Sequence, residues 1–113
     1  MSQFKVITEF ENDIVILITE GYLNQEGGQM IANICLNNID NGITKILLDL
    51  GQTKVVNSIG VSILIEIIEK LQGVEGKLGY FNLAPIVDKT FNIMGLTKYS
   101  SVYPNREDAL ANF

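Results

Sequence analysis

The sequence predicts an α/β fold, in which a mixed central β-sheet of about five strands packs against about four α-helices. Three observations lead to this class. Short segments of alternating or continuous apolar residues recur along the chain, segments with helical spacing of apolar residues separate them, and the first two apolar segments are joined too closely for a helix to intervene. The order β-β-α-β-α-β-α-β-α therefore predicts an antiparallel hairpin followed by parallel neighbours.

The first two segments predict the hairpin. Phe4, Val6 and Thr8 alternate with polar neighbours, which indicates a half-exposed strand. Residues 11–13 have the composition of a tight turn, and 14–18 are continuously apolar, as in a second strand.

A polar break over 21–28 separates this hairpin from the first helix, and we interpret its Gly27 and Gly28 as turn glycines. Between 29 and 39 the apolar residues recur at helical spacing, and Asn41-Gly42 ends the helix.

The middle of the chain predicts a buried strand, a loop and a long helix. Residues 45–50 form a short continuous apolar run, which is typical of a strand covered on both faces. Residues 54–57 are expected to lie in a loop, and a strongly apolar helix is predicted over 58–72.

The last third predicts a strand over 77–83, a helix that starts at Pro85 and stops at Gly95, a brief strand at 102–103, and a final short helix capped by Asn105. The inner face of the helix after Pro85 is expected to consist of Ile86, Val87, Phe91, Ile93 and Met94.

Composition limits the possible classes of function. The chain has 113 residues, 47% of them hydrophobic, so we treat residues 1–113 as one domain with one core. The net charge is −5, from 13 acidic and 8 basic residues, without a Lys/Arg cluster, which argues against nucleic-acid binding. One cysteine and no histidine exclude an internal disulfide, a His-based triad and a His-ligated metal.

No targeting or membrane signal is visible. The segment MSQFKVITEF lacks a basic region followed by a long apolar stretch, so we expect no signal peptide. The longest apolar run, around 63–68, is broken by Glu66 and Glu69 and is too short to cross a bilayer. We therefore expect a cytoplasmic protein.

The most informative segment is 46–61, ILLDLGQTKVVNSIGV, in which a buried strand ends in Asp-Leu and Asn57-Ser58-x-Gly60 opens the long helix. It resembles the signature of the STAS domain family, whose bacterial members include the anti-sigma factor antagonists. The likeness covers nearly the whole chain, since the family's other patterns are matched in order by 21–24, 77–85, 91–96 and 105–110. The resemblance implies a STAS-like fold.

The resemblance also implies a function and a partner. In such antagonists the serine that matches Ser58 is phosphorylated by an anti-sigma factor that is itself a serine kinase of the histidine-kinase-like ATPase fold, and a metal-dependent serine phosphatase resets the cycle. The chain would then work by binding and not as an enzyme. The partner-binding residues implied are Asn24, Val56, Asn57, Ser58, Ile59 and Gly60.

Physical chemistry supports Ser58 as a regulatory position. A serine at a helix start lies beside unpaired backbone N–H groups and the positive end of the helix dipole. A phosphate there adds a charge of about −1.5 to −2, which the N–H groups can hold and which repels acidic partner groups.

Three departures from the family keep an alternative open. The family's two aspartates are matched by Asn24 and Asn57, and the small residue after the serine is Ile59. These residues favour a STAS interaction subunit of a larger signalling or lipid-transport assembly that is never phosphorylated. Ser58, Asn57 and Asn24 could equally be helix caps alone.

The remaining chemistry-bearing residues predict no second site. Cys35 lies on the apolar face of the first helix and is expected to be a small core residue. The carboxylates are scattered among different elements, so we expect no catalytic site, metal or cofactor. The many apolar residues of the helix over 58–72 favour a well-buried helix, and the alternative is an exposed apolar patch around Ile59 and Val55-Val56, which would mark an interface. The chain is expected to be a monomer or a weak homodimer. The carboxylates considered are Asp49, Glu66, Glu69 and Asp88.

Overall fold

The computed structural model describes residues 3–113 and confirms the predicted order of strands and helices. One short 3₁₀ helix, η1, was not expected. The elements are β1 (Lys5–Glu11), β2 (Ile14–Leu23), α1 (Gln25–Asp40), β3 (Lys45–Val56), α2 (Ser58–Gly73), β4 (Lys77–Phe81), α3 (Pro85–Ile93), η1 (Leu96–Lys98), β5 (Ser101–Tyr103) and α4 (Arg106–Asn112).

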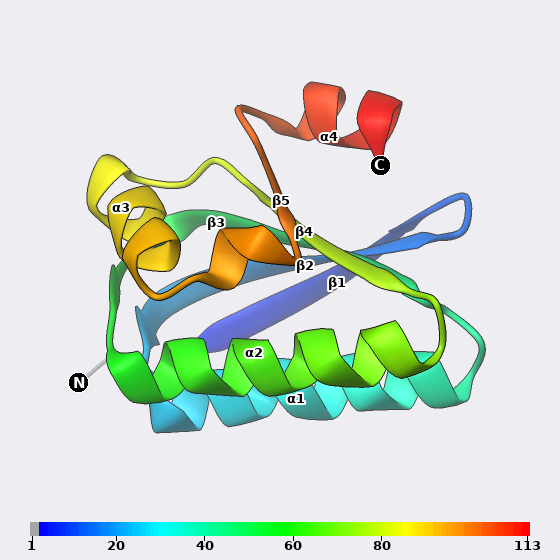
Figure 1. Cartoon of the computed structure of the whole chain (residues 1–113), viewed down its shortest axis with the longest axis horizontal. Helices are drawn as coiled ribbons and strands as arrows, with labels where there is room; N and C mark the ends of the chain where they lie inside the picture. The colour runs from blue at the N-terminus through cyan, green and yellow to red at the C-terminus, as the bar shows by residue number, and fades with distance from the viewer. Residues whose placement is uncertain (1–2) are drawn as a thin grey trace.

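The five strands form one mixed sheet in the order β1-β2-β3-β4-β5. β1 pairs antiparallel with β2, and every later pair is parallel. α1 and α2 lie side by side against one face of this sheet, while α4 lies over the other face (Figure 1). No helix within residues 3–113 combines the length and the hydrophobicity needed to cross a bilayer.

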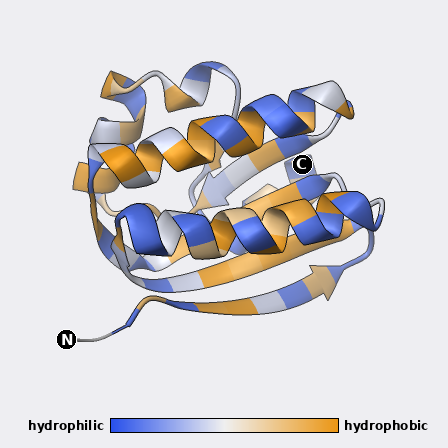
Figure 2. Cartoon of the chain, turned by 90° about the horizontal axis from the view of Figure 1, so that it is seen from below, coloured by the Kyte–Doolittle hydropathy of each residue, from blue (hydrophilic) through white to orange (hydrophobic). Residues whose placement is uncertain are grey.

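The sheet separates two cores because its central strands are apolar on both faces. On β2, Val15 and Leu17 point into the larger core under α1 and α2, whereas Ile14 and Ile16 point into the smaller core under α4. In Figure 2 the strands are mostly hydrophobic where the two long helices cross them. The expectation that the strand beginning at Lys45 is covered on both faces is confirmed.

Two strands are longer than predicted. β2 continues to Leu23 and β3 continues to Val56, through segments that we had interpreted as a polar break and a loop. The two extensions pair with each other, and the buried hydroxyls of Thr19 and Thr53 share a hydrogen bond of 2.6 Å. Because these polar side chains satisfy one another, the strands extend without an apolar pattern. β4 pairs with β3 only up to Asp49, so the last residues of β3 are paired on one side alone.

The predicted start of α1 was wrong. The helix begins at Gln25, so Gly27 and Gly28 lie in its first turn and not in a loop. A Cβ on Gly27 would lie 2.8 Å from Cδ1 of Phe4, and one on Gly28 would lie 2.9 Å from Cδ1 of Ile63. Both glycines are needed for close packing, Gly27 on Phe4, which precedes β1, and Gly28 on Ile63 of α2.

The predicted inner face of α3 was partly wrong. Val87 and Phe91 are buried, but Ile86 and Ile93 are 61% and 74% exposed. A helix of nine residues presents one narrow face, on which positions three or four apart lie together, and the partly buried Met94 continues the face of Val87 and Phe91. Gly95, with φ of 79°, ends this segment as predicted and leads into η1. The predicted strand over 77–83 also stops earlier, at Phe81.

Candidate functional site

Ser58 is the first residue of α2, and it is exposed to solvent. The preceding residue, Asn57, has extended backbone and caps the helix, because its Oδ1 accepts a hydrogen bond of 2.9 Å from the Gly60 N–H. The Ser62 hydroxyl, one turn later, donates to the Ser58 carbonyl at 2.8 Å. The Ser58 hydroxyl therefore stands at a solvent-facing helix start, where both a modifying enzyme and a binding partner could reach it.

Gly60 allows α2 to begin directly against the end of β2. A Cβ on Gly60 would overlap the carbonyl oxygen of Leu23. The Asn57 N–H donates to that same oxygen at 3.0 Å. The glycine of the motif is thus required by backbone packing, and this contact fixes where Ser58 lies.

Asn24 lies at the same edge of the sheet. β2 and β3 are parallel neighbours with Leu23 opposite Val56, so the helices that follow these strands start close together. Asn24 caps α1 as Asn57 caps α2, through a hydrogen bond of 3.0 Å from the Gly27 N–H to its Oδ1. The structure therefore brings two sequence-predicted site residues together as N-caps of neighbouring helices.

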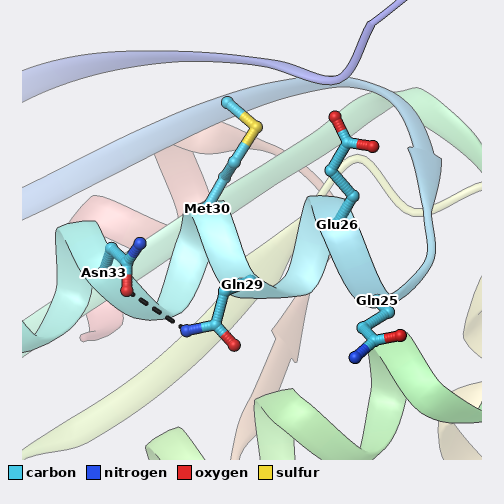
Figure 3. Close-up of a pocket in the computed structure, with 5 residues that line it drawn as sticks. All are labelled: Gln25, Glu26, Gln29, Met30 and Asn33. Carbon is cyan, nitrogen blue, oxygen red and sulfur yellow. Dashed lines mark hydrogen bonds between the residues drawn. The ribbon is translucent and has the colours of Figure 1, made fainter.

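The electrostatic character of this edge follows from its two helix N-termini, each of which carries partial positive charge. Neutral amides cap both helices, and the first turn of α2 contains no acidic residue. The first turn of α1 contains Glu26, but Figure 3 shows Glu26 and Met30 on one side of α1 and Gln25 projecting toward α2. These side chains border a shallow hollow of about 410 Å³ on α1.

Exposed apolar side chains accompany Ser58. Ile59 is 51% exposed and Val55 is 58% exposed, whereas Val56 packs partly against the larger core. Tyr22, which is 46% exposed, lies opposite Val55 in the β2–β3 register, so these two side chains are neighbours on one sheet face. The exposure of Ile59 and Val55 agrees with the alternative of an exposed apolar patch, although Val56 is not part of it. Tyr22 was missed, because only the strand register places it beside Val55.

A second polar cluster, also missed, joins β3 at the last residue that pairs with β4 to the turn that follows β4. The Asp49 Oδ1 accepts hydrogen bonds from the Gly51 N–H at 3.0 Å and from Nδ2 of Asn82 at 3.3 Å. Asn82 has φ of 62°, a left-handed conformation that asparagine tolerates better than most residues. The sequence signal that could have indicated this cluster was Asp49, near the end of the predicted strand over 45–50. Its hydrogen bonds give it a structural role in the turn after β4.

The other candidate groups do not converge. Within residues 3–113, no group of three His, Cys, Asp or Glu side chains is placed to hold a metal ion. Cys35 is fully buried in the larger core, as expected, and burial raises the pKa of its thiol to about 12. The thiol therefore stays protonated and unreactive.

Comparison with known proteins gives the family. The model of the STAS domain matches residues 5–109, and the chain therefore belongs to the STAS domain family. A relative from Bordetella bronchiseptica, BtrV, which is named as a candidate anti-sigma factor antagonist, is 27% identical over 100 residues, or 88% of this chain and 86% of that protein.

Solved structures confirm the STAS fold. A candidate anti-sigma factor antagonist from Thermotoga maritima superposes with a TM-score of 0.86 at 18% identity, over 94% of this chain and 92% of that chain. The phosphorylated form of the Bacillus cell fate determinant SpoIIAA superposes with a TM-score of 0.74 at 21% identity, over 95% and 97% of the two chains.

Proposed function

We propose that this chain is an anti-sigma factor antagonist, which binds an anti-sigma factor in the cytoplasm and is switched by phosphorylation of Ser58. The observation that carries the proposal is the exposed Ser58 hydroxyl at the start of α2, beside the exposed side chains of Val55 and Ile59. The relatives named as antagonists and the phosphorylated form of SpoIIAA support it. The chain acts by binding and not by catalysis.

The proposed partner is an anti-sigma factor that is also a serine kinase of the histidine-kinase-like ATPase fold. In the transfer step, the Ser58 hydroxyl oxygen attacks the γ-phosphorus of ATP, the bond from that phosphorus to the β–γ bridging oxygen breaks, and ADP leaves. The hydroxyl proton passes to a base of the kinase. A metal-dependent serine phosphatase would hydrolyse the phosphoserine and restore the hydroxyl.

The switch follows from a charge added at the start of α2, whose first turn carries no acidic residue. The phosphate replaces a neutral hydroxyl with a charge of about −1.5 to −2. The Gly60 N–H already donates to Asn57, but the N–H groups before it in the first turn of α2 have no acceptor within the helix and can hold the phosphate, so α2 need not move. A partner surface that covers Ile59 would have to desolvate this charge, and the unmodified form is therefore the form that binds.

The direct test combines the purified chain with ATP and the anti-sigma kinase encoded nearest to its gene, followed by mass spectrometry of the intact protein. We expect one added phosphate on the wild type and on Ser62→Ala, and none on Ser58→Ala. Ser62 is the matched control, because it is an exposed serine one turn along the same helix. An unmodified wild type, or equal modification of Ser58→Ala, would contradict the proposal.

A second candidate function is a STAS interaction subunit of a larger signalling or lipid-transport assembly that is not phosphorylated. The neutral caps Asn24 and Asn57 and the bulky Ile59 beside the hydroxyl favour it. Partner capture from native cytoplasm with Ser58→Asp and Ser62→Asp separates the two. A switch predicts loss of binding for Ser58→Asp alone, whereas a constitutive interface predicts similar, modest changes for both variants.

A further inference from the structure

The outer edge of β1 is an open β-strand edge. Over residues 3–113, β1 occupies one end of the strand order and pairs with β2 alone, along the outside of the sheet (Figure 2). The opposite edge strand, β5, has only three residues and is followed by Pro104, which blunts it. β1 has seven residues, contains no proline, and pairs with β2 without a bulge. It is therefore able to accept another strand.

The hairpin geometry fixes which backbone groups of β1 point outward. Glu11 and Ile14 flank a two-residue loop and are paired, so they form a hydrogen-bonded pair. Hydrogen-bonded and non-hydrogen-bonded pairs alternate along an antiparallel ladder. The N–H and C=O groups of Val6, Thr8 and Phe10 consequently face away from β2.

These outward groups and the side chains around them are self-complementary. In an antiparallel pairing of two β1 strands centred on Thr8, the outward groups of Val6 face those of Phe10 in the second copy, and Thr8 faces Thr8. Lys5 then lies opposite Glu11 of the second copy, and two-fold symmetry repeats this pair at the other end. A register centred on Glu9 would instead place like charges together.

The charges needed for this pairing are available. In the single chain, Lys5 Nζ lies 3.8 Å from the Glu20 carboxylate with both side chains more than half exposed, which makes a weak ion pair. Glu11 has no ion-pair partner within residues 3–113. Phe10, 60% exposed, gains Val6 of the second copy as a cross-strand neighbour.

We propose that β1 is a homodimer interface, in which two copies join their edges into one continuous sheet. The two-fold axis is perpendicular to the sheet, so α1 and α2 of both copies lie on the same side of the joined sheet. β2 of one copy runs antiparallel to β2 of the other. The carboxyl ends of β2 and β3, where Ser58 lies, are therefore at opposite ends of the dimer. The second copy therefore covers neither of the two proposed partner-binding surfaces around Ser58.

Sedimentation equilibrium of the full chain tests the interface. We expect a concentration-dependent dimer, about tenfold weaker in Lys5→Glu and in Glu11→Lys, because each reversal places like charges opposite one another twice. The double variant Lys5→Glu/Glu11→Lys should restore the dimer. Dimerisation that is as strong in the single variants as in the wild type, or a double variant that dimerises as weakly as the single variants, would overturn the proposal.

Thr8→Pro gives an independent test. The Thr8 N–H faces outward, so proline removes a dimer hydrogen bond and leaves the ladder to β2 in place. We expect a folded monomer, with the fold checked by circular dichroism. A folded Thr8→Pro chain that still dimerises as the wild type does, or a wild type that stays monomeric at millimolar concentration, would show that β1 is no interface. Should this variant fail to fold, the charge reversals decide.

Discussion

Gly60 determines the position of the candidate site through the atom that it lacks. Its backbone packs on the Leu23 carbonyl, and that contact places the first turn of α2, with Ser58, at the end of β2. The alternative explanation, that glycine is needed for an unusual backbone angle, does not hold, because Gly60 is not among the residues with positive φ. Packing, and not conformation, makes the residue necessary.

We expect Gly60→Ala to lower the free energy of unfolding by about 1–3 kcal/mol, because a backbone carbonyl cannot move aside as a flexible side chain could. Gly73→Ala is the matched control. Gly73 ends the same helix, and a Cβ there meets nothing within 4 Å, so alanine should stabilise the fold by about 0.4–1 kcal/mol. Urea denaturation of both variants measures the difference. Equal stabilities would mean that α2 can shift away from β2 freely.

At the scale of the element, the side-chain amide of Asn57 caps the start of α2. Asn57→Ala removes the hydrogen bond to the Gly60 N–H and should cost about 1 kcal/mol. Asn57→Asp keeps the acceptor and adds a negative charge at the positive end of the helix, so it should gain about 0.3–1 kcal/mol. Chemical denaturation checks both. A loss of similar size in the two variants would show that the amide N–H₂ group, and not the accepting oxygen, matters.

The sequence predicted those elements whose pattern is local. The helix beginning at Ser58 and the strand beginning at Lys45 were found because their apolar residues are continuous or periodic over many positions. The start of α1 was missed because Gly27 and Gly28 resemble a turn, while the reason for them lies in Phe4 and Ile63, which are distant in sequence.

The candidate site was likewise predictable only where its pattern is local. The exposed Ser58 and its capping neighbour follow from a local motif, since a helix start needs a cap and leaves N–H groups free. The nearness of Asn24 to Asn57, and of Tyr22 to Val55, follows from the parallel register of β2 and β3. No local pattern encodes that register, because Glu20, Gln52 and Lys54 interrupt the apolar runs.

At the scale of the whole molecule, the sheet depends on α4 to cover its second face. Ala109 is fully buried there with Ile16 and Phe81, and the Arg106–Glu9 ion pair of 2.6 Å ties α4 to β1. That ion pair is partly exposed, so the smaller core contributes most of the attachment.

We expect Ala109→Glu to destabilise the fold by about 3 kcal/mol, because the carboxylate would be buried without a partner or α4 would detach. Ala111→Glu, on the exposed side of the same helix, should change stability by less than about 0.5 kcal/mol. Urea denaturation gives both values, and increased binding of a hydrophobic dye would report exposure of the smaller core. A small effect at position 109 would mean that α4 is dispensable for folding.

The one-sided pairing at the end of β3 leaves part of this strand outside the β3–β4 ladder. Beyond Asp49 this strand forms a ledge, held by β2 on one side and free of β4 on the other. Val55, the exposed apolar residue of this ledge, has no hydrogen bond to β4 that a contact with another molecule could disturb. If the proposed function is right, substitutions at Val55 can therefore alter what this surface binds while the β3–β4 ladder stays intact.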